Sequence, residues 1–285
     1  MKKRIWRGLL LLVVLVTAGA LFFRWQQESI VTEIYRVRSA DLPASFDGMR
    51  IVHLSDLHGK EFGTNSERLL KKVAALEPDL IAITGDLIDQ ENQLAMVPAL
   101  ARGLAAVAPT YYVTGNHEWA VRRVGDLKGI LSQCGVTVLT NEYITLERAG
   151  STLVVAGVDD PNGPADQKTP QELKAEIDAE LGDVYTVLLS HRDSVFDYAG
   201  WGYGLTLCGH GHGGIIRIPI MDRGLLGTDR QFFPEFDGGL YGFADGGACV
   251  VSRGLGSNTV PFRAFRLFNR PDLPLIILNT SEEVS

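Results

Sequence analysis

The sequence predicts an α/β protein in which two β-sheets pack face to face with helices on the outside. The first observation is a regular alternation of short apolar strands and helices between residues 49 and 134. The second is a series of short strands with brief links that begins at Val136. The third is that polar residues follow each of the early strands, which is typical of a sheet with its functional site at the carboxyl ends of its strands.

Three strand–helix pairs open the body of the chain. The predicted strands are 49–54, 80–83 and 110–113, and the predicted helices are 64–76, 94–107 and 121–134. Asn65 or Thr64 can cap the first of these helices, and Glu77-Pro78-Asp79 ends it. Residues 30–37 alternate in the manner of a strand that leads into the body.

The second half of the chain is richer in strands. We expect strands at 136–139, 143–146, 153–158, 184–189 and 205–208, and glycine-connected strands within 238–251 and at 275–278. A helix at 171–181 has Thr169 as its cap and Pro170 at its first position. Since no linker-like stretch divides residues 46–285, we expect them to form one domain.

An apolar segment near the N-terminus is predicted to cross a membrane. Residues 8–23 carry no charge, and these 16 residues are slightly fewer than the ~20 that span a bilayer. Arg7 and Arg24 can reach the two interfaces, where Trp6 and Trp25 also fit. We therefore expect a basic tip and transmembrane anchor over 1–25, followed by a linker and lead-in strand over 26–45.

The charges around this segment predict its orientation. Four bases precede the apolar run and one follows it, which places the N-terminus in the cytoplasm. The expected location is the cell membrane, with a single pass and the main domain outside the cytoplasm. A cleaved signal peptide is the alternative, because Ala18-Gly19-Ala20 has the form of a cleavage site.

The composition limits the partners of the main domain. Beyond the five bases of the first 24 residues, 22 bases face 34 acids, so the rest of the chain carries about −12. A body this acidic is a poor non-specific partner for nucleic acid, and we expect none. Cys134, Cys208 and Cys249 have no metal-site or disulfide-framework spacing and are expected to be buried apolar residues.

Residues able to bind metal gather at the strand ends. They are Asp56, His58, Asp86, Asn116, His117, His191, His210 and His212. The last two lie in the glycine-rich run 209–214, whose glycines allow a tight turn and the close approach of a ligand. A structural zinc site would be richer in cysteine and closed at four ligands.

Mixed Asp, His and Asn ligands suit two divalent or trivalent metal ions such as Mn, Fe or Zn. The candidate ligands are too many for one ion and about right for two that share a carboxylate. Two ions roughly 3.5–4 Å apart are the arrangement that holds the attacking and leaving oxygens in phosphoryl transfer. The sequence therefore favours a dinuclear site.

These motifs resemble those of the calcineurin-like metallophosphoesterases. The resemblance rests on Asp56-x-His58, Gly85-Asp86, 115–118 (Gly-Asn-His-Glu), His191 and 209–212 (Gly-His-Gly-His), in the family's order. It implies a four-layer α/β/β/α sandwich and a metal-dependent phosphoester hydrolase, whose bridging hydroxide attacks phosphorus.

The resemblance also implies a role for each residue. One metal would be held by Asp56, His58, Asp86 and His212, and the other by Asp86, Asn116, His191 and His210. His117 would assist the leaving group, oriented by Glu118. The implied substrate is a phosphorylated small molecule or lipid.

Two positions depart from the family pattern. The run 85–90 (Gly-Asp-Leu-Ile-Asp-Gln) lacks an arginine that many members have after the Gly-Asp motif, and Gly211 replaces a common threonine. The anchor resembles that of the membrane-associated bacterial branch, which leaves a pyrophosphohydrolase of nucleotide-linked lipids (UDP-diacylglucosamine type) as an alternative. A non-catalytic metal-binding module is a further alternative.

Three features admit a structural interpretation. His53 is expected to be a core or supporting histidine. Arg192 and Arg253 could contact a phosphate, but packing or surface roles are favoured for both. The aromatic stretch 231–239 is either a loop beside the site that faces a membrane or an ordinary buried loop.

Overall fold

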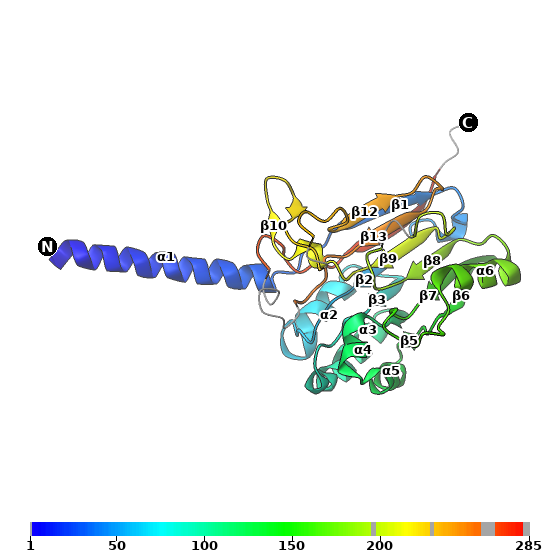
Figure 1. The fold of residues 1–285 in the computed structure, drawn as a ribbon, viewed down its shortest axis with the longest axis horizontal. Coiled ribbons are helices and arrows are strands. Elements are labelled where there is room, and N and C mark those ends of the chain that lie inside the picture. Colours follow the sequence, from blue (N-terminus) through cyan, green and yellow to red (C-terminus); the bar gives the residue numbers. More distant parts are fainter. Residues whose placement is uncertain (1, 195–197, 229–230, 258–265, 282–285) are drawn as a thin grey trace.

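Two six-stranded β-sheets form the body of the protein (Figure 1). The structure, a computed structural model, describes residues 2–194, 198–228, 231–257 and 266–281. In order across the first sheet, the strands are β1 (Ile34–Ser39), β14 (Leu275–Thr280), β2 (Arg50–Leu54), β3 (Leu80–Thr84), β4 (Thr110–Val113) and β5 (Thr137–Val138). In the second, they are β12 (Gly239–Gly242), β13 (Ala248–Val251), β9 (Leu205–Cys208), β8 (Thr186–Leu189), β7 (Ser151–Gly157) and β6 (Glu142–Arg148).

Helices cover the outer faces of both sheets, which gives the four-layer α/β/β/α sandwich that the resemblance implied. Alternate residues of one strand face opposite layers. Ile51 packs in the core between the two sheets, whereas Val52 packs in the core beneath the helices of the first sheet. That outer layer consists of α2 (Glu67–Ala74), α3 (Val97–Ala105) and α5 (Val124–Gln133). On the second sheet, Leu173 and Ile177 of α6 (Pro170–Leu181) pack in the outer core.

The polarity of the strands brings their carboxyl ends together. β2, β3, β4 and β5 run parallel in the first sheet, and β7, β8, β9 and β13 run parallel in the second. Apart from the short edge strand β5, these strands are largely buried on both faces, which explains their continuous apolar sequences. The loops that leave them form one edge of the sandwich, where the predicted ligands lie.

The helix predicted over 121–134 corresponds to α5, and a separate short helix precedes it. The first helix, α4 (Asn116–Val121), ends at Arg122, whose φ of 61° is left-handed, and α5 follows. A right-handed helix cannot continue through a left-handed residue. The prediction also missed the start of α4, which places Asn116 and His117 in its first turn.

The other helices differ from the prediction mainly at their ends. Thr64 and Asn65 lie in a short 3-10 turn, η2 (Thr64–Ser66), and neither caps α2, so that prediction was wrong. A second 3-10 turn, η3 (Glu91–Met96), occupies the start of the predicted helix at 94–107. The cap of α6 is confirmed, because the side chain of Thr169 accepts a hydrogen bond from the amide of Glu172.

Two further features lie outside the layers. The long helix α1 (Lys2–Glu28) projects from one end of the body (Figure 1). It is long and apolar enough to cross a membrane, and none of its most apolar window is buried. At the same end of the body is a two-stranded hairpin, β10 (Arg217–Ile218) and β11 (Arg223–Gly224), which the sequence analysis did not anticipate.

Candidate metal centre

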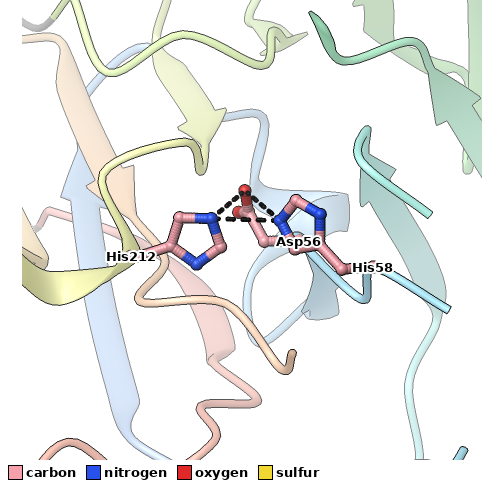
Figure 2. Close-up of side chains that lie close together, drawn as sticks. All are labelled: Asp56, His58 and His212. Atoms are coloured by element: carbon pink, nitrogen blue, oxygen red, sulfur yellow. Dashed lines mark hydrogen bonds and ion pairs between the residues drawn. The ribbon is translucent and has the colours of Figure 1, made fainter. Parts of the chain in front are cut away.

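The first group of candidate ligands joins the ends of β2 and β9. Asp56 and His58 follow β2, and His212 lies in the loop after β9. In Figure 2 the rings of His58 and His212 approach the Asp56 carboxylate from opposite sides. The Nε2 atoms of the two rings are 3.0 Å apart, and they lie 3.8 Å and 3.5 Å from Asp56 Oδ1. The three side chains are buried, and each offers one ligand atom within 4.8 Å of the other two, as a single bound cation requires.

The second group joins the ends of β3, β4, β8 and β9. His191 Nε2 lies 3.3 Å from Asp86 Oδ2, 3.1 Å from Asn116 Oδ1 and 3.2 Å from His210 Nδ1. Asp86 and His191 are buried, whereas Asn116 and His210 are partly exposed. The structure therefore brings together all four residues predicted for a second metal position.

Asp86 connects the two groups. Its Oδ2 atom lies 3.8 Å from His58 Nε2 in the first group, in addition to its contact with His191 in the second. The His210 amide also donates to Asp56 Oδ2, at 3.0 Å. The seven predicted ligands thus form one continuous cluster with a carboxylate between its halves.

The backbone at the cluster is strained. Five candidate ligands have φ between 49° and 69°, namely Asp56, His58, Asp86, His210 and His212. The left-handed conformation costs a non-glycine residue roughly 1–2 kcal/mol. Such strain persists only where the surrounding structure imposes it, and it is typical of functional sites.

Gly209 illustrates how closely the loops pack. A Cβ atom at this position would lie 1.9 Å from Ser55 Oγ and 2.3 Å from Asp56 Oδ2. Any side chain here would push the Asp56 carboxylate out of the first group. The glycine is therefore required by the close approach of two loops.

Hydrogen bonds to the outer ring nitrogens orient two of the four candidate histidine ligands. His58 Nδ1 donates to Asp89 Oδ1 at 2.5 Å, and His191 Nδ1 donates to the carbonyl oxygen of Thr84 at 2.8 Å. In the neutral ring that binds a metal, a proton on Nδ1 leaves the lone pair on Nε2, the atom that faces the cluster. The outer ring nitrogens of His210 and His212 instead face the guanidinium groups of Arg192 and Arg266. Because a guanidinium group only donates hydrogen bonds, these two contacts do not favour the tautomer that leaves a lone pair on the nitrogen facing the cluster.

Asp89 is a site residue that the sequence analysis missed, although it lies in the run that departs from the family pattern. Its Oδ1 atom accepts hydrogen bonds from the Nδ1 atoms of both His58 and His117, the latter at 2.7 Å. His117 is 24 % exposed, and its Nε2 atom lies 3.9 Å from Asp86 Oδ2. The signal was an acidic residue three positions after Asp86.

The expected role of Glu118 is corrected by the geometry. The Glu118 carboxylate accepts hydrogen bonds from the amides of Asp86, Leu87 and Gly115, at 3.0, 2.6 and 2.7 Å. It is fully buried and stabilises the loops after β3 and β4. The residue that orients the ring of His117 is therefore Asp89, because Glu118 faces backbone amides instead.

Arginine side chains flank the two histidines of the 209–214 loop. Arg266 is fully buried, and its Nη2 atom lies 3.3 Å from His212 Nδ1. Arg192 lies with Nη1 3.2 Å from His210 Nε2, and its Nε donates to Asp160 Oδ2 at 2.6 Å. Arg253 pairs with Asp272 and Glu33 away from the cluster, as the structural interpretation expected.

Burial and charge act in opposite directions on the candidate histidines. Burial lowers the pKa of His210 and of His212 to about 3, and the neighbouring cations act in the same direction. Burial also opposes the charge of His58 and His191. At these two rings nearby carboxylates outweigh burial and raise the pKa to about 10.

Burial and neighbouring charges also act in opposite directions on the pKa values of the carboxylates. Burial disfavours the ionised forms of Asp56 and Asp86, but the surrounding histidines hold the pKa of each carboxyl below its usual range. Both groups are thus ionised at neutral pH, as metal ligands must be.

His53 lies apart from this cluster. Its Nε2 atom pairs with Thr84 Oγ1 at 2.8 Å, which agrees with the expected supporting role.

One cavity adjoins the cluster, and a second cavity shares Arg192 with it. The first has a volume of about 360 Å³ and is lined by His210, Gly211, Gln231 and residues 234–236. The second, of about 320 Å³, has a more apolar lining that includes Tyr198 and Trp201. The aromatic stretch 231–239 thus lies beside the site, and Phe232 and Phe233 within it are exposed.

The fold is a four-layer α/β/β/α sandwich, and paired clusters of histidines and carboxylates lie at its strand ends. This combination defines a metallophosphoesterase-like protein. The profile of the calcineurin-like phosphoesterase family matches residues 49–217. This match covers more than half of the chain and includes all seven candidate ligands. The chain therefore belongs to the calcineurin-like phosphoesterase family, whose members hydrolyse phosphoester bonds.

Three relatives illustrate the range of the family. The chain is 28 % identical over 263 residues to the uncharacterized metallophosphoesterase YkuE of Bacillus subtilis, covering 88 % of this chain and 86 % of that protein. It is 28 % identical over 257 residues to the phosphodiesterase YaeI of Escherichia coli, covering 86 % and 88 %. A Bos taurus transmembrane protein with a metallophosphoesterase domain is 30 % identical over 254 residues, which cover 84 % of this chain and 55 % of that protein.

Proposed function

We propose that the protein is a metal-dependent phosphoester hydrolase that binds two metal ions. The first position comprises Asp56, His58, Asp86 and His212, and the second comprises Asp86, Asn116, His191 and His210. The observation that carries this proposal is the position of Asp86 Oδ2, 3.8 Å from His58 Nε2 and 3.3 Å from His191 Nε2. A carboxylate that faces ligands of both groups is suited to bridge two cations.

The donor set supports a pair of borderline metal ions. Imidazole nitrogens and carboxylate oxygens are mixed in both groups, and no cysteine thiol lies among these ligands. Mn, Fe and Zn are the candidates. Two bound cations would activate a water molecule as the nucleophile and neutralise charge on the phosphate.

The protein's own residues would complete the reaction. Asp89 holds the Nδ1 proton of His117, so in the protonated ring the opposite nitrogen, Nε2, is free to donate its own proton to the leaving oxygen. The side chain of His117 is 24 % exposed, which leaves it accessible to a substrate. Arg192 lies next to His210 at the junction of both cavities, where its guanidinium can hold a phosphate oxygen.

Hydrolysis of aryl phosphate monoesters and diesters with Mn(II) tests this proposal. We expect His210→Ala and His117→Ala to lose activity, while Leu181→Ala on the distant helix α6 behaves as wild type. Asp89→Asn should lower activity by roughly 10–100-fold, the usual effect of removing a partner that orients a site residue. Equal activity in all variants would contradict the proposal.

The assay should also include nucleotide-linked lipid pyrophosphates. Turnover of these compounds without turnover of simple esters would favour the pyrophosphohydrolase alternative. Stoichiometric metal binding without turnover of any substrate would favour a non-catalytic binding module.

We further propose that α1 anchors the protein in the cell membrane with the body outside the cytoplasm. The apolar helix and the excess of bases at its N-terminal end support this orientation. A reporter fused after Ser285 should read out as extracytoplasmic, and the mass of the mature protein should include α1. A cytoplasmic read-out would contradict the orientation, and a shortened chain would indicate a cleaved signal peptide.

A further inference from the structure

Large apolar side chains are exposed at one end of the body. Outside α1, the described residues include eight exposed large apolar side chains, and five of them lie in the segments 220–233 and 266–270. These five, which we call the apolar rim, are Ile220 (97 % exposed), Met221 (58 %), Phe232 (68 %), Phe233 (42 %) and Phe268 (47 %). Clustered exposure of this kind marks an interaction surface.

Backbone contacts hold the segments of the rim together. Ile220 and Met221 lie in the turn between β10 and β11. The side chain of Arg223 in β11 donates to the carbonyl oxygen of Phe233 at 2.9 Å, and Leu226 forms a bridge with Phe232. At the base of the hairpin, the amide of Arg217 donates to the carbonyl oxygen of Leu267, the neighbour of Phe268.

The rim is continuous with the apolar surface of α1. The ring of Phe268 lies 6.0 Å from that of Phe22 in α1, and Arg270 stacks on Trp25 with 4.6 Å between its guanidinium and the ring centre. Gln27 and Arg266 are joined by hydrogen bonds. In Figure 1 the hairpin and the C-terminal end of α1 lie at the same end of the body.

The rim also borders the opening of the candidate metal centre. Pro234, Glu235 and Phe236 directly follow the exposed Phe232 and Phe233, and they line the cavity of about 360 Å³ that contains His210. The loop 231–236 therefore carries exposed apolar side chains and also contributes residues that line this cavity.

We propose that the apolar rim inserts into the surface of the same bilayer that α1 enters. A lipid bilayer is the occupant that fits, because the rim continues the surface of a helix that is itself apolar enough to lie in a membrane. The cavity beside His210 would then open next to the lipid headgroups. Resting on the proposed function, this placement makes a phosphorylated lipid headgroup the favoured substrate class.

Fluorescence quenching in lipid nanodiscs tests the insertion with the full-length chain. Ile220→Cys and Phe232→Cys would carry a fluorophore. Leu181→Cys is a matched control, since Leu181 is an exposed apolar residue (38 %) of α6, a helix that Figure 1 shows at the opposite end of the body from α1. The three natural cysteines are buried, which favours selective labelling. Lipids brominated on their acyl chains should quench the labels at 220 and 232 and leave the label at 181 unquenched.

Two results would overturn the proposal. The first is equal quenching at all three positions. The second is an emission change at 220 and 232 that occurs only when a nanodisc holds two copies of the chain. That result would show that the rim contacts a second copy and not the lipid.

Activity measurements on two substrates separate the role of the apolar rim from that of the candidate metal centre. The double variant Ile220→Asp/Phe232→Asp should hydrolyse a phosphorylated lipid in nanodiscs about tenfold more slowly, since charged side chains oppose insertion. Its activity on a soluble aryl phosphate should match that of Leu181→Asp. If the double variant lost both activities, or neither, the proposal of a lipid substrate would be wrong. If the wild-type chain were inactive, the proposed function would be wrong, and the quenching experiment alone would then test the insertion.

Discussion

The two halves of the candidate metal centre are built from similar ligands but differ in their surroundings. The inner half, Asp56, His58 and His212, is buried, and the fully buried Arg266 contacts His212. In the outer half, Asn116, His191 and His210, the partly exposed His210 lines a cavity of about 360 Å³, and Arg192 contacts His210.

The two arginines show what this difference means. Arg266 donates from Nε to the carbonyl oxygen of Gly256 at 2.8 Å and from Nη2 to that of Arg253, so it joins segments of the interior. Arg192 is 29 % exposed and pairs with the buried Asp160. An arginine enclosed by carbonyl oxygens stabilises the fold, whereas one at a cavity wall is available to an anionic substrate.

The largest effect is expected from Asp86→Ala, because Asp86 contacts both halves. We expect the loss of both metal ions and a decrease in kcat/KM of about a thousandfold or more, since metal ions supply several kcal/mol of transition-state stabilisation. Metal analysis of the purified protein and steady-state kinetics measure these quantities. Retention of either ion at full occupancy would contradict the bridging role.

Replacing one histidine at a time should separate the halves. His212→Ala should lose the inner ion and His210→Ala the outer one, each with a decrease in activity of about a hundredfold and an intact fold. Metal stoichiometry, paired with circular dichroism to check the fold, measures the outcome. If both variants lost the same ion, the assignment of the two histidines to different halves would be wrong.

Arg266→Lys should destabilise the protein. A lysine cannot donate in a fixed fork to two carbonyl oxygens and to His212, and each buried acceptor left without a donor costs about 1–3 kcal/mol. We expect a lower Tm in detergent solution, with Arg192→Lys as the matched control at the wild-type Tm. Equal Tm values for the two variants would remove the distinction between the arginines.

Arg192→Lys should have the smallest effect, confined to substrate binding. The lysine keeps a positive charge beside Asp160 but loses the two-pronged geometry, so KM should rise up to about tenfold. Metal content and Tm should not change. A decrease in kcat at constant KM would instead indicate that Arg192 acts on the reaction step.

The grouping of the candidate ligands could be predicted from the sequence because it depends on strand order in a simple way. Asp56, Asp86, Asn116, His191 and His210 each follow a short apolar strand. Parallel strands present their carboxyl ends at one edge, so residues far apart in the chain are brought together whatever the lengths of the intervening helices. The four-layer fold followed from the same pattern and the family resemblance.

The partners of these ligands were decided only by the tertiary structure. Asp89 binds the rings of His58 and His117, and Glu118 binds loop amides, because the loops after β3 and β4 pack together. Arg266 reaches His212 from 54 residues away along the chain. Strand periodicity determines which residues reach the edge of the sheet, but hydrogen bonds between loops depend on backbone paths that no local pattern specifies.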